Sequence, residues 1–355
     1  MPNKKTPILF GIPLHFDYIC YANHPHPLNP MISEKDFGQT AAIIDYLQQV
    51  PYDVTRKTLY CAHDLYEGYN PLVDESFNTC FDSKVYHHFV STGKQRADAK
   101  EKLARTLHDH GVYTALDDFF KDHDQQQCVG IMGGHAQLRN DPNYRDIVLL
   151  SKRLTEQGFC MLSGGGPGAM EATHLGAWMA GRSVKDVDWA LQLMSGAPSF
   201  NDTGWLSTAW QVMERFPQEK YHSLGIPTWL YGHEPSTPFA THIAKFFENS
   251  IREDNILTLA YGGIIYTPGR AGTLQEIFQD AVQNHYLSLG LSSPMIFMGK
   301  KFWTEEMPVY PLLESMAMTG KYHNLILSIT DDPEEIVEQL ENFRATHQMP
   351  LSSKQ

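Results

Sequence analysis

Residues 159–181 read FCMLSGGGPGAMEATHLGAWMAG, and this stretch decides the fold. An apolar run of strand length ends in a cluster of glycines, and an apolar segment of helix length follows. Glycines at the end of a strand let a ligand approach the backbone, and the next helix directs free N–H groups and a partial positive charge at it. A tight turn also uses glycine, but four glycines within five residues exceed what a turn needs. We therefore favour a ligand-binding loop.

The same alternation of strand and helix patterns extends outward from this loop. Further strand-length apolar runs are CVGIMGG at 128–134, GGIIYTPG at 262–269, PMIFMG at 294–299 and LILSIT at 325–330. Helix-length amphipathic segments separate them, as in TLQEIFQDAVQNHYL at 273–287. Apolar strands that alternate with helices predict an α/β fold, with a Rossmann-like parallel sheet covered by helices on both faces.

Changes in pattern along the chain predict its domains. Residues 128–346 form the Rossmann-like nucleotide-binding domain, with an insertion near 181–223 where the alternation is interrupted. Residues 1–127 mix short apolar runs with proline and aromatic residues, and predict a smaller mixed α/β or α+β region of unknown role. Residues 347–355 form a tail.

Four local predictions accompany this division. Two amphipathic helices are expected in the N-terminal region, one over residues 33–50 and one over 94–111 that ends at Gly111 as its C-cap glycine. In the second half, IPTWLYG at 226–232 reads as a strand, and a long helix is expected from Pro238 to about residue 257.

Composition bounds the classes of function. The 355 residues include 42% hydrophobic residues, enough for a large core, and carry a formal net charge of −13. An acidic chain is a poor nonspecific ligand for nucleic acid or anionic lipid, so we expect neither as a partner. The five cysteines lack CxxC spacing, no signal-peptide or membrane-spanning pattern is found, and neighbouring histidines lack a third ligand. These features predict a cytoplasmic protein without a metal.

A second glycine loop lies between the strand GGIIYT and the next helix. It reads TPGRAGTLQE over residues 267–276. Thr273 and Glu276 have the spacing of a capping box, which is the structural alternative to a role in binding. However, glycines precede the threonine, an arginine lies within the loop, and a similar loop exists elsewhere in the expected sheet. Two such loops would converge at the carboxyl edge of a parallel sheet, where ligands of open α/β folds bind.

The first loop also matches the dinucleotide fingerprint G-x-G-x-x-A through Gly164, Gly166 and Ala169. That fingerprint requires an acidic residue at the end of the next strand, about 20 residues further on. Asp186 and Asp188 lie at this distance, but within a helical pattern. An NAD(P)-dependent oxidoreductase is therefore disfavoured, and no P-loop motif for an ATPase occurs.

GGGPGAM followed by PGRAGTLQE resembles the LOG family, whose signatures are GGGxxGxM and PGGxGTxxE. Members of this family are Rossmann-like proteins long labelled lysine decarboxylases, although the characterised ones are nucleotide phosphoribohydrolases. The resemblance covers about residues 128–299. With GGHA after the first strand, an N-terminal extension and an insertion, the chain is most similar to the longer pyrimidine/purine nucleotide 5′-monophosphate nucleosidases.

The resemblance implies a set of site residues. The catalytic pair would be Arg252 and Glu276, and Gly134 and His135 are further possible contacts. The substrate- and phosphate-binding positions would be Gly164, Gly165, Gly166, Gly168, Met170, Gly269, Arg270, Gly272 and Thr273. Two residues depart from the family pattern, since Arg270 replaces the second glycine of PGG and Glu253 replaces a lysine of shorter members. From the sequence alone, a surface arginine paired with Glu248 is a plausible interpretation of Arg252, and the resemblance favours the catalytic role.

The resemblance implies an enzyme that hydrolyses the N-glycosidic bond of nucleoside 5′-monophosphates to free base and ribose 5-phosphate, without a cofactor. Decarboxylation through pyridoxal phosphate is rejected, because neither glycine loop contains a lysine and the chain has no His-Lys dipeptide. A non-catalytic nucleotide sensor is the main alternative. Beyond the nucleoside monophosphate substrate, we expect a second copy of the chain as partner, in a dimeric or tetrameric homo-oligomer.

Overall fold

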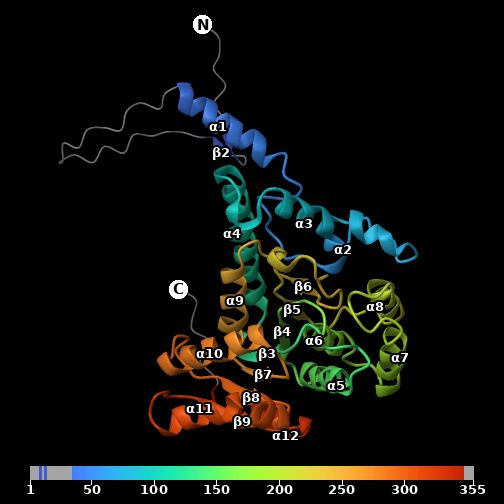
Figure 1. Ribbon diagram of the computed structural model, residues 1–355, viewed down its shortest axis with the longest axis vertical. Coiled ribbons are helices and arrows are strands. Elements are labelled where there is room, and N and C mark those ends of the chain that lie inside the picture. The colour runs from blue at the N-terminus through green and yellow to red at the C-terminus, as the bar shows by residue number, and fades with distance from the viewer. Residues whose placement is uncertain (1–7, 10–11, 14–33, 348–355) are drawn as a thin grey trace, which may run out of the picture.

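A computed structural model describes residues 8–9, 12–13 and 34–347, with side chains from residue 41 onward. Seven strands of this part form one sheet in which all pairings are parallel, in the order β6-β5-β4-β3-β7-β8-β9 (Figure 1). The strands are β3 (Cys128–Met132), β4 (Cys160–Ser163), β5 (Ser223–Gly225), β6 (His242–Ile243), β7 (Gly263–Tyr266), β8 (Pro294–Phe297) and β9 (Ile326–Ile329). The predicted α/β fold with a Rossmann-like parallel sheet is confirmed.

The strand order creates a switch point in the middle of the sheet. The chain begins at β3 and moves outward through β4, β5 and β6, and then returns to pair β7 with the free side of β3. The remaining strands continue outward in the opposite direction. The loops after β3 and β7 therefore leave neighbouring strands in opposite directions, which opens the crevice where open α/β sheets bind ligands.

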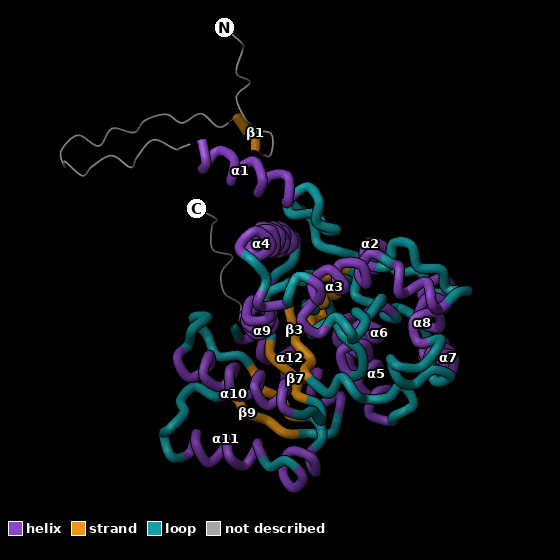
Figure 2. The backbone as a smooth tube through the Cα atoms, turned by 45° about the horizontal axis from the view of Figure 1, so that its top comes forward, coloured by secondary structure: helices purple, strands orange, loops and turns teal. Residues whose placement is uncertain are grey.

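Helices cover both faces of the sheet, as Figure 2 shows. Right-handed crossovers that move in opposite directions place their helices on opposite faces. Thus α5 (Pro142–Glu156) and α6 (Ala169–Trp178) lie on one face, and α10 (Ala271–Tyr286) and α11 (Val309–Met318) on the other. The last helix, α12 (Pro333–Thr346), packs against α5. Strands β3, β4, β7 and β8 are buried along their whole length, because both faces are covered.

The described part of the N-terminal region is mostly helical. A two-stranded antiparallel pair, β1 (Ile8–Leu9) and β2 (Ile12–Pro13), precedes the helices. They are α1 (Glu34–Leu47), α2 (Ala62–Leu65), α3 (Phe81–Ser91) and α4 (Ala99–Asp122). The helix predicted over 33–50 is therefore confirmed as α1.

The prediction that Gly111 ends a helix is wrong. Helix α4 begins after Asp98, whose carboxylate accepts from the N–H of Glu101, and continues through Gly111 to Asp122. A Cβ at position 111 would overlap the backbone carbonyl of Arg56. This glycine provides the close approach of another chain segment to the helix, and not a helix end.

Helices α7 (Val184–Met194) and α8 (Trp205–Arg215) occupy the predicted insertion, between α6 and β5. Asp186 lies in the first turn of α7 and forms a reciprocal capping box with Ser183. Asp188 pairs with Arg145 at 2.9 Å. Neither aspartate lies at the end of a strand, which removes the acidic residue that a dinucleotide site would need.

The region from 223 to 258 differs from its prediction. The strand expected at 226–232 is not found there. Strand β5 occupies the three residues before it, Ser223–Gly225, and Trp229–Tyr231 form a short 3-10 helix. The long helix expected from Pro238 is also wrong, since this segment contains the short strand β6, and α9 spans only Asn249–Thr258. The apolar residues of this segment are buried without lining a helix face: Phe247 contacts Tyr52 and Phe89 of the N-terminal region, and Phe239 contacts Trp178 of α6.

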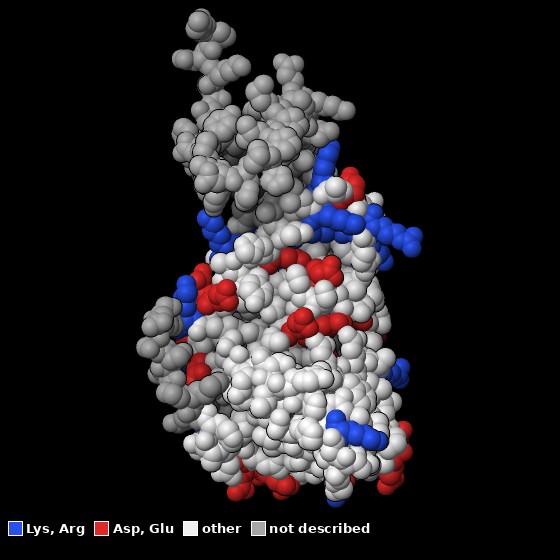
Figure 3. All heavy atoms as spheres, turned by 90° about the vertical axis from the view of Figure 1, so that its left-hand side faces the viewer, with Lys and Arg blue, Asp and Glu red and all other residues white. Residues whose placement is uncertain are grey.

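Surface and terminal features complete the description. On the face shown in Figure 3, Lys and Arg side chains of the described residues are scattered and form no continuous basic surface. Among the described helices, none is both long and apolar enough to cross a bilayer. Apart from His347, the tail predicted at 347–355 lies outside the described residues.

Candidate functional site

Three loops meet at the carboxyl edge of the central strands. The N–H of Gly134, after β3, donates to the carbonyl of Pro268, after β7, at 3.2 Å. The carbonyl of Gly134 accepts from the N–H of Ala169 at 3.1 Å, which is the first residue of α6 after the β4 loop. The two glycine loops are therefore joined through a third loop, which contains Gly134 and His135.

Two glycines are required by this packing. Gly168 has a φ of 70°, and a Cβ there would overlap the carbonyl oxygen of Gly134. Gly269 is needed for a different reason, because a Cβ would overlap the hydroxyl of the buried Thr273. Larger residues at either position would force the loops apart.

The N-terminus of α10 is open. Its first helical hydrogen bond is donated by Leu274 to the carbonyl of Arg270 at 3.0 Å, so the N–H groups of residues 271–273 precede that bond. A Cβ built on Gly272 has nothing within 4 Å, and the side chain of Arg270 is exposed. Free N–H groups, a helix dipole and an arginine are suited to an anion. By contrast, the N–H of Ala169 in α6 is already bonded to Gly134.

The capping-box interpretation of the second loop is wrong. Helix α10 begins at Ala271 with Arg270 as its N-cap, so Thr273 and Glu276 are its third and sixth residues. Glu276 lies in the second turn, and not in the first turn as expected. The spacing that suggests a cap instead places both side chains on consecutive turns of one helix.

Glu276 faces Arg252 across two neighbouring helices. The Arg252 Nη1 atom lies 3.9 Å from Glu276 Oε1, and the two side chains are 13% and 16% exposed. A Cβ built on Gly164 would lie 3.5 Å from Arg252 Nη2, so this arginine also lies against the first glycine loop. The alternative in which Arg252 pairs with Glu248 on the surface is not observed among the described contacts. The structure thus brings Arg252, Glu276 and Gly164 together.

Polar contacts fix α9 against α10. Gln275 donates to Glu253 at 2.8 Å, and Gln279 donates to Asp254 at 2.6 Å. The Nε atom of Arg252 is buried and lacks a hydrogen-bond partner among the described residues. A buried guanidinium nitrogen that is left unpaired is costly, and a ligand group could satisfy it.

Burial controls the ionisation of Glu276. Removal from water raises its pKa to about 7, and the Arg252 charge opposes this rise while the Glu253 charge adds to it. Asp280, one turn further along α10, has its pKa raised to about 7, also by burial, while the hydroxyl of Tyr266 donates to it at 2.8 Å and opposes the rise. A carboxyl group with a pKa near 7 exchanges protons readily at neutral pH.

A thioether and a carboxylate, from Met170 and Glu234, lie next to the first glycine loop. The Met170 side chain lies against Gly164 and Gly166, where built Cβ atoms would be 2.7 and 2.8 Å from its sulfur and methyl carbon. Glu234 Oε2 lies 3.9 Å from the Cβ position of Gly166. Its other oxygen lies 3.8 Å from Nε2 of His135. The side chains beside the first glycine loop are therefore Arg252 and Met170 at Gly164, and Met170 and Glu234 at Gly166.

Sequence reasoning missed Glu234 and the groups beneath the first loop. Ser163 Oγ accepts from the N–H of Gly165 at 3.1 Å and lies 2.9 Å from His174 Nε2. The other ring nitrogen of His174 lies 2.9 Å from Ser223 Oγ, and burial lowers the pKa of this histidine to about 3. These single polar residues have no motif spacing. Only Ser163 and Ser223, at the end of β4 and the start of β5, have a position beside a strand terminus that could have indicated a role.

A cavity of about 450 Å3 adjoins the second glycine loop. Thr267 and Pro268 line it together with Gly299, Lys300 and Lys301, which follow β8. The described residues contain no group of three or more His, Cys, Asp or Glu side chains arranged to hold a metal ion.

A scan against protein-family models gave no match, and a search of curated proteins found no similar sequence either. Solved structures that are similar include TM1055, a structural genomics target, at 20% identity and a TM-score of 0.39, covering 61% of this chain and 98% of that chain. The Moco carrier protein of Chlamydomonas rheinhardtii matches at 14% identity and a TM-score of 0.36, covering 61% and 97%. The molybdenum cofactor binding protein from the phototrophic bacterium Rippkaea orientalis matches at 16% and 0.37, covering 61% and 96%. At TM-scores below 0.5, neither the family nor the function of this chain follows from these similarities.

Proposed function

We propose that this protein hydrolyses the N-glycosidic bond of nucleoside 5′-monophosphates. The observation that carries the proposal is Glu276, a largely buried carboxyl group with a pKa of about 7, placed 3.9 Å from Arg252 beside two glycine loops. Breaking the bond from C1′ to the base nitrogen builds positive charge on the ribose. An ionised Glu276 stabilises that charge and accepts a proton from the attacking water.

The phosphate end is assigned to the start of α10. The N–H groups of Ala271, Gly272 and Thr273 precede the first helical hydrogen bond there, the Cβ position of Gly272 is open, and Arg270 is exposed. Glu276 lies four residues after Gly272, a rise of about 6 Å on the same side of the helix. A 5′-phosphate at the helix start therefore leaves the ribose within reach of Glu276.

Arg252 orients the sugar. Its Nε has no partner among the residues that the structure describes, and its position between Glu276 and Gly164 suits hydrogen bonds to ribose hydroxyls or to the phosphate. The base then extends over Met170, whose thioether offers an apolar surface to a ring. Glu234 and His135 would meet the edge of that base.

The atoms of the reaction balance without a cofactor. Water adds its oxygen to C1′ as the bond to the base nitrogen breaks, which gives ribose 5-phosphate. The bonding electrons stay with the base, and the proton that Glu276 takes from water is returned through solvent to the base nitrogen. The carboxylate is regenerated in the form that begins the next cycle.

The test is incubation of the purified protein with a panel of nucleoside 5′-monophosphates, with chromatography for free base and a colorimetric assay for ribose 5-phosphate. We expect both products in equal amounts from at least one nucleotide, and loss of both in the Glu276→Gln variant. Nucleotide binding by calorimetry without any product would refute the hydrolase and favour a non-catalytic sensor.

A further inference from the structure

The start of α9 is held by a residue of the N-terminal region. The carboxylate of Asp109, from α4, accepts from the N–H of Phe247 at 3.0 and 3.1 Å and from the N–H of Glu248 at 2.9 Å. Glu248 is the N-cap residue of α9, and its own side chain makes no cap hydrogen bond. An acidic group from another element thus satisfies N–H groups at the positive end of this helix.

Asp109 is itself fixed in place. It is 3% exposed, and the ring of His108 donates from Nδ1 to its Oδ1 at 2.9 Å. The other ring nitrogen lies 2.8 Å from the hydroxyl of Tyr60. The backbone of Tyr60 exchanges two hydrogen bonds with Ile243 in β6, at 2.7 and 2.8 Å. The carboxylate therefore has little freedom to move relative to the sheet.

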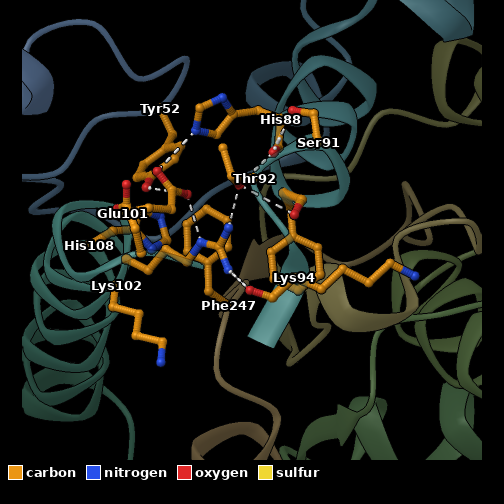
Figure 4. Close-up of polar contacts among 12 residues, drawn as sticks. Tyr52, His88, Ser91, Thr92, Lys94, Glu101, Lys102, His108 and Phe247 are labelled. Atoms are coloured by element: carbon orange, nitrogen blue, oxygen red, sulfur yellow. Dashed lines mark hydrogen bonds and ion pairs between the residues drawn. The ribbon is translucent and has the colours of Figure 1, made fainter. Parts of the chain in front are cut away.

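Aromatic rings hold Phe247 from the same side. Its ring centroid lies 4.4 Å from that of Trp229, 4.6 Å from Tyr52 and 5.1 Å from His108. Figure 4 shows Phe247 and His108 beside the polar network of Glu101, which accepts from the hydroxyl of Tyr52 at 3.2 Å. Residues of the N-terminal region, together with Trp229 after β5, thus enclose the segment that leads into α9.

The N-terminal region has a separate attachment to the rest of the protein. The buried Lys245 forms an ion pair with Asp82 of α3 at 2.6 Å. That pair, on the segment before Phe247, secures the region to the fold, whereas Asp109 acts at the helix start itself. Arg252 follows one turn later, and its N–H donates to the carbonyl of Glu248 at 3.4 Å.

We propose that Asp109 is a positioning residue which, with the aromatic enclosure of Phe247, sets the place of α9 and hence of Arg252 opposite Glu276. The N-terminal helices are then a working part of the site. This inference rests on the function proposed above for its kinetic test, but not for the measurement in the absence of substrate described below.

A purely structural Asp109 would alter stability alone, so the test needs a readout at Glu276. The charged groups that shift the pKa of Glu276 are Arg252 and Glu253, both from α9. Two further titratable groups lie nearby: Tyr266 of β7, whose own pKa is raised partly by the Glu276 charge, and Asp280, one turn further along α10. Arg252 is the cation among them, and it opposes the raised pKa of Glu276. If Arg252 moves away, the pKa of Glu276 must rise further.

The experiment compares the full-length Asp109→Asn, Arg252→Gln and double variants with wild type. Asn preserves the shape but exchanges one acceptor oxygen for an amide donor that faces N–H groups. Leu116→Ala, two turns along α4 and 2% exposed, is the matched control, because it loosens the helix but keeps the carboxylate of Asp109. The two readouts are kcat/KM against pH on a nucleotide that the wild type cleaves, and the titration of the Glu276 carboxyl followed by 13C NMR without substrate.

We expect Asp109→Asn to lower kcat/KM about 10- to 100-fold, to move the acidic limb of the pH profile to higher pH, and to raise the NMR pKa of Glu276. Adding Asp109→Asn to Arg252→Gln should change little more, and Leu116→Ala should lower thermal stability without moving either pKa. An unmoved NMR pKa in folded Asp109→Asn, or a multiplicative loss in the double variant, would overturn the proposal. If the wild type cleaves no nucleotide, the hydrolase fails while the NMR titration still decides the role of Asp109.

Discussion

Replacement of Glu276 by Gln separates the proposed chemistry from the stability of the fold. Gln keeps the shape of the side chain and loses both the negative charge and the base. Loss of a general base costs about 10²–10⁴ in rate, and loss of charge stabilisation adds to that. We therefore expect kcat to fall by at least about 100-fold, with nucleotide binding retained through the start of α10.

The pH dependence of the wild type follows from the same group. With a pKa of about 7, Glu276 is ionised above neutral pH and protonated below it. Because the reaction uses the ionised form, kcat/KM should rise with pH and level off above about 7, with about one tenth of the plateau at pH 6. The Gln variant should lack this limb in whatever activity remains.

The stability of the variant should change in the opposite direction to its activity. Glu276 has its pKa raised from 4.5 to about 7 in the folded protein, so folding favours the protonated form. Below pH 4.5 the group is protonated in both the folded and the unfolded protein, and it does not lower the free energy of unfolding. As the pH rises from 4.5 to 7, ionisation of the buried group lowers the free energy of unfolding by about 3 kcal/mol at most. The Gln variant should therefore be more stable than wild type at pH 8 and equal to it near pH 4.5.

Asp280→Asn provides the control for this comparison. Asp280 lies one turn away on α10 with a pKa also raised to about 7, but it faces Tyr266 and not Arg252. It should share the gain in stability at pH 8 and keep most of the activity. Thermal unfolding at pH 5 and pH 8, beside kcat for each variant, gives both answers. A Glu276→Gln enzyme that remains within a few-fold of wild type would refute the assignment of the carboxylate.

Three further changes test other parts of the site and fold. Arg270→Gly removes the exposed cation beside the open start of α10, and we expect steady-state kinetics to show KM for nucleotides raised about tenfold to a hundredfold with kcat preserved. Glu234→Gln exchanges a hydrogen-bond acceptor for a donor at the end of the site assigned to the base. The ranking of nucleotides by kcat/KM should therefore change, while the acidic limb of the pH profile, which Glu276 sets, stays in place. An unchanged ranking would show that Glu234 does not contact the base. Gly111→Ala improves helix propensity by about 1 kcal/mol, yet the overlap with the Arg56 carbonyl should lower the melting temperature, and a higher melting temperature would contradict the close packing.

The centre of the sheet could be predicted because its strands are apolar on both faces and are followed by glycines. Strands β3, β4 and β7 each appear in the sequence as an uninterrupted buried run followed by a glycine loop. Short edge strands lack this signal, so β6, with only two residues, was not predicted. The helix expected over the same segment shows the limit of periodicity, since its apolar residues are buried by contacts with other elements, as Phe239 is with Trp178 and Phe247 with Tyr52, and not on a helix face.

Only those parts of the site that belong to a sequence motif could be predicted. The glycine loops and Glu276 are local in sequence, and the structure places them together. Arg252 was assigned by resemblance, and its proximity to Glu276 depends on two helices whose packing no spacing reveals. Glu234 and Asp109 were missed because each is an isolated acid in the sequence, whose partners come from distant elements.

Helix α9 connects these findings, because its residues contact both the N-terminal region and α10. Its start is bonded to Asp109 of the N-terminal region, Arg252 faces Glu276, and Glu253 and Asp254 bind side chains of α10. A short helix held at one end and along one side has few independent ways to move, so a displacement at its start must change the distance from Arg252 to Glu276. Burial raises the pKa of the carboxyl group, and the Arg252 charge opposes that rise. Any ligand or partner that moved the N-terminal helices would therefore change this opposing effect, the ionisation of Glu276 and the rate near neutral pH.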